Sequence, residues 1–383
     1  MKIKSKSQIK RGEKFNLNKF KNLFCEKESK KYKIYEYPKF EDKNYWKKSK
    51  NFINKGKILF ISGPARSGNH LLLSLLDGHK EIQPHPGEDD FLRSIFTETN
   101  KSEQKLLKVL RSKYNWKYIL SLSGQAPFGK KKGFNKWKQL SNSKSNKKKI
   151  WSGKQKEGAG HVYDYQGVKT DIDYRSYEDH LKKKSKEISK AKTFLDVFSI
   201  YLDAVKKLYS EDNKKKFNHV WFGSGLRREL KFLLERNKNI ICLVPIRKFE
   251  TFYFSYSLSR HNTRKIEQKA LDDLWEHWRH KVVDYLLLKK KYPKNIIILQ
   301  YEDLVNDTSK TIEKISKKLK IKFNKKMLIP TIFGSKTKGN STYGKTNKNL
   351  GKVYKTSTKY DFPKNILPKE YYQILKIVKK NSI

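Results

Sequence analysis

The sequence predicts an α/β fold in which a mostly parallel β-sheet is flanked by helices on both faces. Short apolar runs typical of buried strands occur at residues 57–63, 219–222, 239–246 and 296–299. Between them, apolar residues recur at the spacing of one helical face, most clearly over residues 194–208 and 271–286. Buried strands that alternate with amphipathic helices are typical of a parallel sheet covered on both sides.

The first predicted strand leads into a glycine-containing turn and a leucine-rich helix. Gly63 and Gly68 are separated by Pro-Ala-Arg-Ser, leucines follow at residues 71–76, and Gly78 is expected to end the helix. A turn of this kind presents free backbone N–H groups and the positive end of the helix dipole to an anion. We therefore predict a P-loop-type fold with an anion site at this turn, against the alternative of an ordinary Gly/Pro turn.

The two residues that follow Gly68 depart from the nucleotide-binding P-loop pattern. That pattern requires a lysine that reaches the terminal phosphates and then a hydroxyl that holds magnesium, and here the two positions are Asn69 and His70. The departure favours an anion site that uses no metal. A P-loop small-molecule kinase remains the alternative enzyme.

The remaining organisation follows from composition. Residues 1–55 form a basic N-terminal extension, and residues 56–383 form one domain. Within it, residues 125–160 are rich in Lys, Gly, Ser and Asn, which is typical of an insertion or a loop on the acceptor side. Ile312, Ile315 and Leu319 mark a further helix, with Thr308 as its expected N-cap.

The charge of the chain is strongly positive. It carries 89 Lys plus Arg against 38 Asp plus Glu, a formal net charge of +51. Such a field favours anionic partners, including nucleotides, acidic glycans, membrane surfaces and nucleic acid. Because no helix-turn-helix, zinc-finger or aromatic single-strand signature is present, we expect no specific nucleic-acid partner. A non-enzymatic nucleic-acid or polyanion binder is an alternative suggested by charge alone.

The chain has two cysteines, of which Cys242 lies inside a predicted buried strand and is expected to be an inert core thiol. We expect no metal site. The N-terminus has positive charge without a following apolar region, and no stretch approaches the roughly 20 apolar residues that span a bilayer. We therefore expect a soluble, cytoplasmic protein.

Several motifs together resemble the sulfotransferases that use 3′-phosphoadenosine 5′-phosphosulfate (PAPS), the Golgi and bacterial type more than the cytosolic type. They occur in the family's order over about residues 57–345. The motifs are Gly-x-x-Arg-Ser-Gly at 63–68, Leu-Asp-x-His-x-x-Ile at 76–82, Gly-Glu at 87–88, Val-Pro-Ile-Arg at 244–247 with Ser255, Tyr-Glu-Asp-Leu at 301–304 and Gly-Asn-Ser at 339–341. Asn69 and His70 stand where the family usually has Thr or Ser, although both can donate hydrogen bonds.

The resemblance implies roles for individual residues. Arg66 would stabilise charge on the transferred sulfuryl group and its leaving oxygen, because a guanidinium donates several fixed N–H groups. Arg247 and Ser255 would hold the 3′-phosphate that distinguishes PAPS from simpler nucleotides. The residues implied to bind the donor are Arg66, Ser67, Gly68, Asn69, His70, Arg247, Ser255, Gly339, Asn340 and Ser341.

The acceptor side is less specified. Glu88 matches the family's glutamate base, His85 is the competing base, and a solvated acidic loop with Asp89 and Asp90 is the structural alternative. The acceptor would supply a hydroxyl or an amine. From the charge we expect an anionic glycan or a lipid-linked glycan, in the latter case with contact to a membrane surface.

Overall fold

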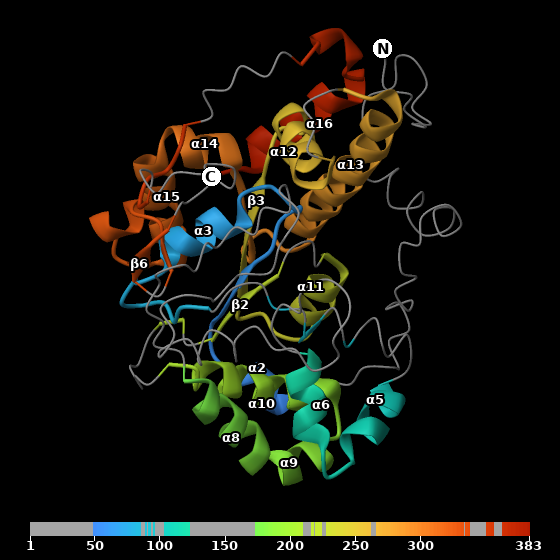
Figure 1. The fold of residues 1–383 in the computed structure, drawn as a ribbon, viewed down its shortest axis with the longest axis vertical. Helices are drawn as coiled ribbons and strands as arrows, with labels where there is room; N and C mark the ends of the chain where they lie inside the picture. Colours follow the sequence, from blue (N-terminus) through green and yellow to red (C-terminus); the bar gives the residue numbers. More distant parts are fainter. Residues whose placement is uncertain are drawn as a thin grey trace.

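The computed structural model describes residues 49–85, 89, 91–92, 95, 103–122, 173–209, 216–217, 219–223, 227–261, 266–332, 334–337, 350–355 and 362–383 (Figure 1). The strands are β1 (Ile58–Ile61), β2 (His219–Phe222), β3 (Ile240–Ile246), β4 (Ile296–Gln300), β5 (Thr331–Ile332) and β6 (Ser335–Lys336). The helices before β2 are α2 (Lys50–Ile53), α3 (Asn69–Leu76), α5 (Glu103–Leu110), α6 (Asn115–Leu122), α8 (Tyr174–Lys183), α9 (Ser185–Ser189) and α10 (Phe194–Lys206). The helices after β2 are α11 (Arg227–Leu234), α12 (Phe249–His261), α13 (Gln268–Lys291), α14 (Tyr301–Asn306), α15 (Thr308–Leu319), η2 (Lys325–Leu328), η4 (Lys364–Ile366) and α16 (Lys369–Asn381).

The central sheet has four parallel strands in the order β2-β1-β3-β4. The chain therefore leaves β1 toward β2 on one side and leaves β3 toward β4 on the other. The carboxyl ends of β1 and β3 lie at the point where the winding direction changes, which is where open α/β sheets bind their ligands. The predicted parallel sheet flanked by helices is confirmed.

Helices cover both faces of the sheet and its amino-terminal end (Figure 1). α3 packs against β1 and β3, whereas α13 and α16 pack against β4, and α13 also packs against α11. A separate group of helices, which contains α2, α5, α6, α8, α9 and α10, lies at the end of the sheet away from α3 and α12 (Figure 1). α3, α12 and α14 begin just after the carboxyl ends of β1, β3 and β4.

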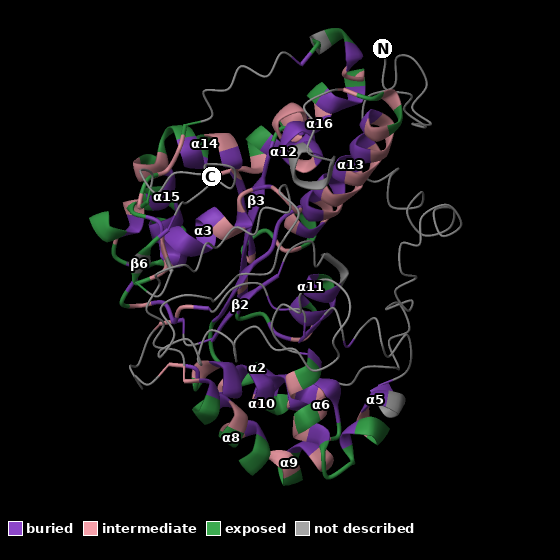
Figure 2. Cartoon of the chain, viewed as in Figure 1, coloured by how far each residue is buried: buried purple, intermediate pink, exposed green. Residues whose placement is uncertain are grey.

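The core follows the apolar runs of the sequence. All residues of β1 and β2 are buried, and so is one face of α10 (Figure 2). Three of the largest fully buried side chains are tryptophans, namely Trp221, Trp275 and Trp278. Burying a large apolar side chain contributes about 1.5–3 kcal/mol, so these three tryptophans and the many buried phenylalanines can support a core despite the lysine-rich composition.

Several details refine the sequence-based predictions. The helix expected over 271–286 extends to Gln268–Lys291. Gly78 follows α3 with a φ of +72°, as expected of a helix stop. The prediction that Thr308 caps α15 is wrong by one residue, because the Asp307 carboxylate accepts the N–H of Lys310 at 3.3 Å. Asp caps a helix well since its short side chain reaches the free N–H groups of the first turn.

The end of the predicted N-terminal extension packs on the domain. Phe52 of α2 is fully buried and its ring lies 5.7 Å from that of Phe198 on α10. The Ser49 hydroxyl donates to the Asp196 carboxylate at 2.6 Å, and Lys55 pairs with Asp203. The rest of the extension, residues 1–48, lies outside the described residues, as does the whole lysine-rich stretch 125–160.

Candidate functional site

The turn between β1 and α3 has an unusual backbone. Gly68 is the N-cap of α3 with a φ of +91°, and Arg66 has a φ of +63° although it carries a side chain. A Cβ on Gly68 would lie 2.5 Å from Cδ2 of Tyr301, so the ring and the turn are in close contact. Positive φ at a non-glycine residue is uncommon and occurs often at ligand sites.

Asn69 holds this turn in shape. Its Oδ1 accepts the N–H of Gly63 at 2.7 Å, and its Nδ2 donates to the carbonyls of Gly63 and Pro64 at 3.2 and 3.0 Å. The side chain is 3% exposed. In this structure the Asn69 side chain therefore bonds to the turn itself and leaves only its backbone N–H for an anion, which differs from the direct side-chain contact implied by the resemblance.

The neighbouring residues of the turn differ in their surroundings. The Ser67 Oγ is fully buried and has no hydrogen-bond partner among the described residues. The His70 ring packs edge-on against Phe222 at the end of β2, with centroids 4.7 Å apart. Because the first turn of any α-helix has N–H groups without intrahelical acceptors, the start of α3 with Ser67 provides donors suited to an anion.

Arg247 directly follows β3, at the switch point of the sheet. Its Nη1 donates to the Arg66 carbonyl at 3.2 Å, its Nε donates to Thr251 Oγ1 at 3.1 Å, and its guanidinium lies 4.3 Å from the centre of the Tyr301 ring. Arg66 in turn donates from Nε to Ser255 Oγ at 3.3 Å. The structure thus brings Arg66, Arg247 and Ser255 together, although they come from β1–α3, the end of β3 and α12.

Tyr301 joins these parts. Its ring lies between Gly68 and the Arg247 guanidinium and is 3% exposed. Trp278 fixes the backbone of Arg247, since the Trp278 Nε1 donates to the Arg247 carbonyl at 2.8 Å. Sequence reasoning found Tyr301 as a motif member but gave it no contact, and it missed Thr251. The spacing of four residues between Arg247 and Thr251 was the available signal, because residues four apart are neighbours on a helix.

The Leu-Asp-x-His motif after α3 has a structural role. The Asp77 Oδ2 accepts from Thr331 Oγ1 at 2.8 Å and from the N–H of Gly334 at 2.9 Å, which anchors the β5–β6 hairpin. The His79 ring bonds to the Lys322 carbonyl at 2.8 Å. The hairpin then leads to Thr337, whose carbonyl accepts the N–H of Gly351 at 2.8 Å.

The third predicted donor-binding segment lies between those two bonded residues. Gly339, Asn340 and Ser341 are outside the described residues, but the described residues on either side of them, Thr337 and Gly351, are bonded to each other.

The candidate base Glu88 also lies outside the described residues, but its neighbour Asp89 is firmly placed. Asp89 is 1% exposed, and its carboxylate accepts from Phe91 N at 2.8 Å, Tyr201 Oη at 2.6 Å and Trp221 Nε1 at 3.0 Å. Burial raises the pKa of Tyr201, so its phenol stays protonated and donates a hydrogen bond to Asp89. Asp89 is therefore not part of a solvated acidic loop.

Asp89 is anchored to the end of β2. Its N–H donates to the Phe222 carbonyl at 2.9 Å, and the ring of Phe222 contacts His70. Asp89 thus lies at the carboxyl edge of the sheet.

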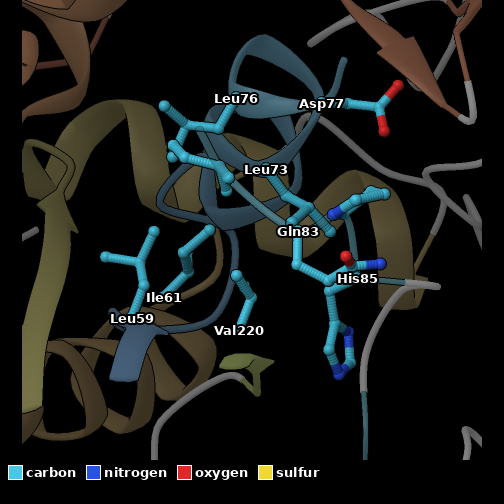
Figure 3. Close-up of a pocket in the computed structure, with 10 residues that line it drawn as sticks. Leu59, Ile61, Leu73, Leu76, Asp77, Gln83, His85 and Val220 are labelled. Atoms are coloured by element: carbon cyan, nitrogen blue, oxygen red, sulfur yellow. The ribbon is translucent and has the colours of Figure 1, made fainter. Parts of the chain in front are cut away.

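The competing base His85 lines a small cavity beneath α3 (Figure 3). Its side chain is 4% exposed. The cavity of about 10 Å³ is walled mostly by apolar side chains, among them Leu59, Ile61 and Val220. A space of this size holds about one water molecule, so it is too small to admit an acceptor.

Among the described residues, no group of three or more His, Cys, Asp or Glu side chains could hold a metal ion. None of the helices in the described part of the chain is both long and apolar enough to cross a bilayer. Cys242 is buried within β3, and burial raises the pKa of its thiol, as expected of an inert core cysteine.

The sequence profile of the sulfotransferase family matches residues 59–325, a span that contains the turn, Arg247, Ser255 and Tyr301. The chain belongs to this family. No curated protein sequence matches the chain.

Solved structures similar to this chain include two sulfotransferase domains and one sulfotransferase. The sulfotransferase domain of the olefin synthase from Synechococcus PCC 7002 has 14% identity and a TM-score of 0.46, covering 88% of this chain and 97% of that one. The sulfotransferase domain from the curacin biosynthetic pathway has 13% identity and a TM-score of 0.44, covering 85% and 97%. A sulfotransferase from Mycobacterium tuberculosis has 15% identity and a TM-score of 0.36, covering 72% and 70%.

Proposed function

We propose that this sulfotransferase moves a sulfuryl group from PAPS to a hydroxyl or amine acceptor. The observation that carries the proposal is that two groups of hydrogen-bond donors suited to anions lie together at the switch point of the sheet. One is the turn before α3 with Arg66 and Ser67, and the other is Arg247 with Ser255. PAPS has a 5′-phosphosulfate and a 3′-phosphate, and two adjacent cationic sites suit such a donor.

The residues present fit the donor chemically. The buried Ser67 Oγ has no hydrogen-bond partner among the described residues, and an oxyanion would supply one. The left-handed backbone at Gly68 directs the helix start toward the same place. A kinase is disfavoured because the residue at the P-loop lysine position, Asn69, is bonded within the turn.

In the proposed reaction, the acceptor oxygen or nitrogen bonds to sulfur while the bond from sulfur to the 5′-phosphate oxygen breaks. Glu88 takes the acceptor proton, and Arg66 stabilises the charge that develops on the leaving phosphate oxygen. The products are the sulfated acceptor and adenosine 3′,5′-bisphosphate.

The donor assignment is tested by binding. Arg247→Ala should weaken the binding of adenosine 3′,5′-bisphosphate about 10- to 100-fold, because charge-assisted hydrogen bonds contribute roughly 1.5–3 kcal/mol. Binding of adenosine 5′-phosphate, which lacks the 3′-phosphate, should change little. Isothermal titration calorimetry in EDTA measures both nucleotides, and circular dichroism checks the fold. Equal affinity of the folded variant and the wild type for the bisphosphate would remove the case for PAPS, and binding of ATP only with magnesium would favour a kinase.

For the acceptor we propose an anionic glycan, free or lipid-linked at a membrane surface. The support is the surplus of 51 positive charges, far more than one nucleotide requires. Dextran and carboxymethyl dextran share one backbone and differ in charge, so labelled-sulfate transfer to the two polymers tests the idea. The anionic polymer should be used better, with a KM that rises with salt, since the screening length is about 10 Å at 0.1 M. Better use of neutral dextran, with a salt-insensitive KM, would contradict the proposal.

A further inference from the structure

We propose that Glu302 is a positioning residue of the donor site, because its carboxylate acts through Thr251 to fix the Arg247 guanidinium in the orientation that receives the 3′-phosphate. The inference rests on the proposed function, since it takes Arg247 as the ligand of that phosphate. It concerns a carboxylate beside an anion site, where a negative charge would ordinarily be unfavourable.

A continuous chain of hydrogen bonds links the two side chains. Arg247 Nε donates to Thr251 Oγ1 at 3.1 Å, and Thr251 Oγ1 lies 3.0 Å from Glu302 Oε1. A threonine hydroxyl donates one proton, so it can bond either to Glu302 or to the Lys248 carbonyl at 3.1 Å. An ionised carboxylate is the stronger acceptor. The hydroxyl proton therefore points at Glu302, and its lone pairs face Arg247.

Glu302 also fixes the backbone on which these groups stand. Its Oε1 accepts the N–H of Lys248 at 3.1 Å, directly before α12 begins. An acceptor at this position pairs a free N–H of the helix start, and its negative charge interacts favourably with the helix dipole. Since α12 carries both Thr251 and Ser255, one carboxylate sets the start of the helix that bears two residues of the donor site.

The Arg247 guanidinium is thereby restrained on several sides. Thr251 holds Nε, the Arg66 carbonyl holds Nη1, and the Tyr301 ring covers one face at 4.3 Å. Nη2 makes no hydrogen bond with any residue that the structure describes. A guanidinium fixed in this way loses little conformational entropy when a phosphate binds to its remaining N–H groups.

The second carboxylate oxygen of Glu302, Oε2, lies in an environment that is unfavourable for a charged group. Oε2 is shielded from solvent and has no hydrogen-bond partner among the described residues, and burial raises the pKa of the Glu302 carboxyl. A buried acceptor without a partner is unfavourable for folding. The hydrogen bonds of Oε1 can be kept by a neutral side chain, so Glu302→Gln should preserve the positioning that Glu302→Ala removes.

The test compares adenosine 3′,5′-bisphosphate with adenosine 5′-phosphate by isothermal titration calorimetry. Glu302→Ala should weaken binding of the bisphosphate about three- to tenfold, the value of one or two hydrogen bonds, and leave the monophosphate within about twofold of wild type. Thr251→Val, which removes the linking hydroxyl, should give the same selective loss. Glu302→Gln should bind within about twofold of wild type, and so should Asp303→Ala, which makes the same charge change at an exposed neighbour.

A double-mutant cycle separates positioning from a general structural role. In the Arg247→Ala background, Glu302→Ala should cause no further loss of bisphosphate binding. Equal weakening of both nucleotides, or a full additional loss in that background, would overturn the inference. If Glu302→Ala does not fold, as judged by thermal unfolding without ligand, Thr251→Val decides in the same way.

The outcomes also separate this inference from the proposed function. A wild-type protein that does not prefer the bisphosphate to the monophosphate refutes the donor assignment and the role of Glu302 together. A preference that Arg247→Ala abolishes but that Glu302→Ala and Thr251→Val retain refutes only the role of Glu302.

Discussion

Asn69 stands at the position of the P-loop lysine, and its side chain is bonded on both polar atoms to the turn that precedes it. The amide closes the turn by three hydrogen bonds to Gly63 and Pro64, which a lysine could not make because it has no acceptor. A turn held from within needs neither a metal nor a bound nucleotide to keep its shape. The strain of the left-handed Arg66 is then offset by these bonds, and the N–H groups at the start of α3 are kept in place for the 5′-phosphate that we propose to bind there.

The assignment of Glu88 as the catalytic base can be tested by substitution. Glu88→Gln keeps the shape of the side chain but cannot take a proton, so sulfate transfer from PAPS to carboxymethyl dextran should slow about 10²- to 10⁴-fold while affinity for adenosine 3′,5′-bisphosphate stays unchanged. His85→Gln should retain transfer, because His85 faces a cavity that admits no acceptor. Labelled-sulfate assays of the two variants decide between the bases. A near-normal rate for Glu88→Gln with an inactive His85→Gln would reverse the assignment.

Residue types could be predicted at this site, whereas most contacts could not. An arginine after a buried strand and a glycine-rich turn before a helix are local patterns, and both pointed to the carboxyl edge of the sheet. The place of Tyr301 between Gly68 and Arg247 depends on three segments more than 50 residues apart. The same applies to Glu302, whose position beside Thr251 follows from the docking of α14 next to α12.

At the scale of elements, the hairpin β5–β6 contacts the end of α3 and precedes, along the chain, the segment that bears Gly339, Asn340 and Ser341. Asp77 at the end of α3 bonds to Thr331 and Gly334 across more than 250 residues of sequence. The helix whose start is proposed to hold the 5′-phosphate thus also anchors, at its other end, the entry to that segment. A displacement of α3 would therefore reach the β5–β6 hairpin as well as the turn.

The four strands of the central sheet and the helices α3, α10, α13 and α15 could be predicted because burial leaves a dense apolar run or a clear helical period, whereas α11, α12 and α16 were not predicted. The short helices α5, α6, α8 and α9 were not predicted. They have five to ten residues each, so their local preference is weak and tertiary packing decides their structure. α5, α8 and α9 pack on α10, and α6 packs on α5, α8 and α9. Strands of two residues, such as β5 and β6, carry no periodicity at all. The order of the strands was likewise inaccessible, because local patterns do not record which strands pair.

At the scale of the whole molecule, positive charge and acid stability are linked at the amino-terminal end of the sheet. His219 begins β2 there and is 8% exposed. Burial lowers the pKa of His219 to about 4, with Lys55 and Lys206 acting in the same direction and Asp203 opposing them. Asp203 cannot fully compensate, because it lies 3.8 Å from the ring and is paired with Lys55.

The folded state therefore holds His219 neutral, whereas an unfolded histidine binds a proton near pH 6.5. Since the folded pKa is depressed, the unfolded state binds more protons between pH 6.5 and about 4, and stability falls as the pH falls through that window. Between pH 7 and pH 5 the contribution is about 1–2 kcal/mol of unfolding free energy, at 1.36 kcal/mol per pKa unit. His219→Gln cannot titrate, so urea unfolding of this variant should lose that much less stability over the same interval. Repulsion among the remaining positive charges acts on both proteins and cancels in the comparison. Identical pH dependence of the two proteins would mean that His219 is protonated in the folded state at pH 5.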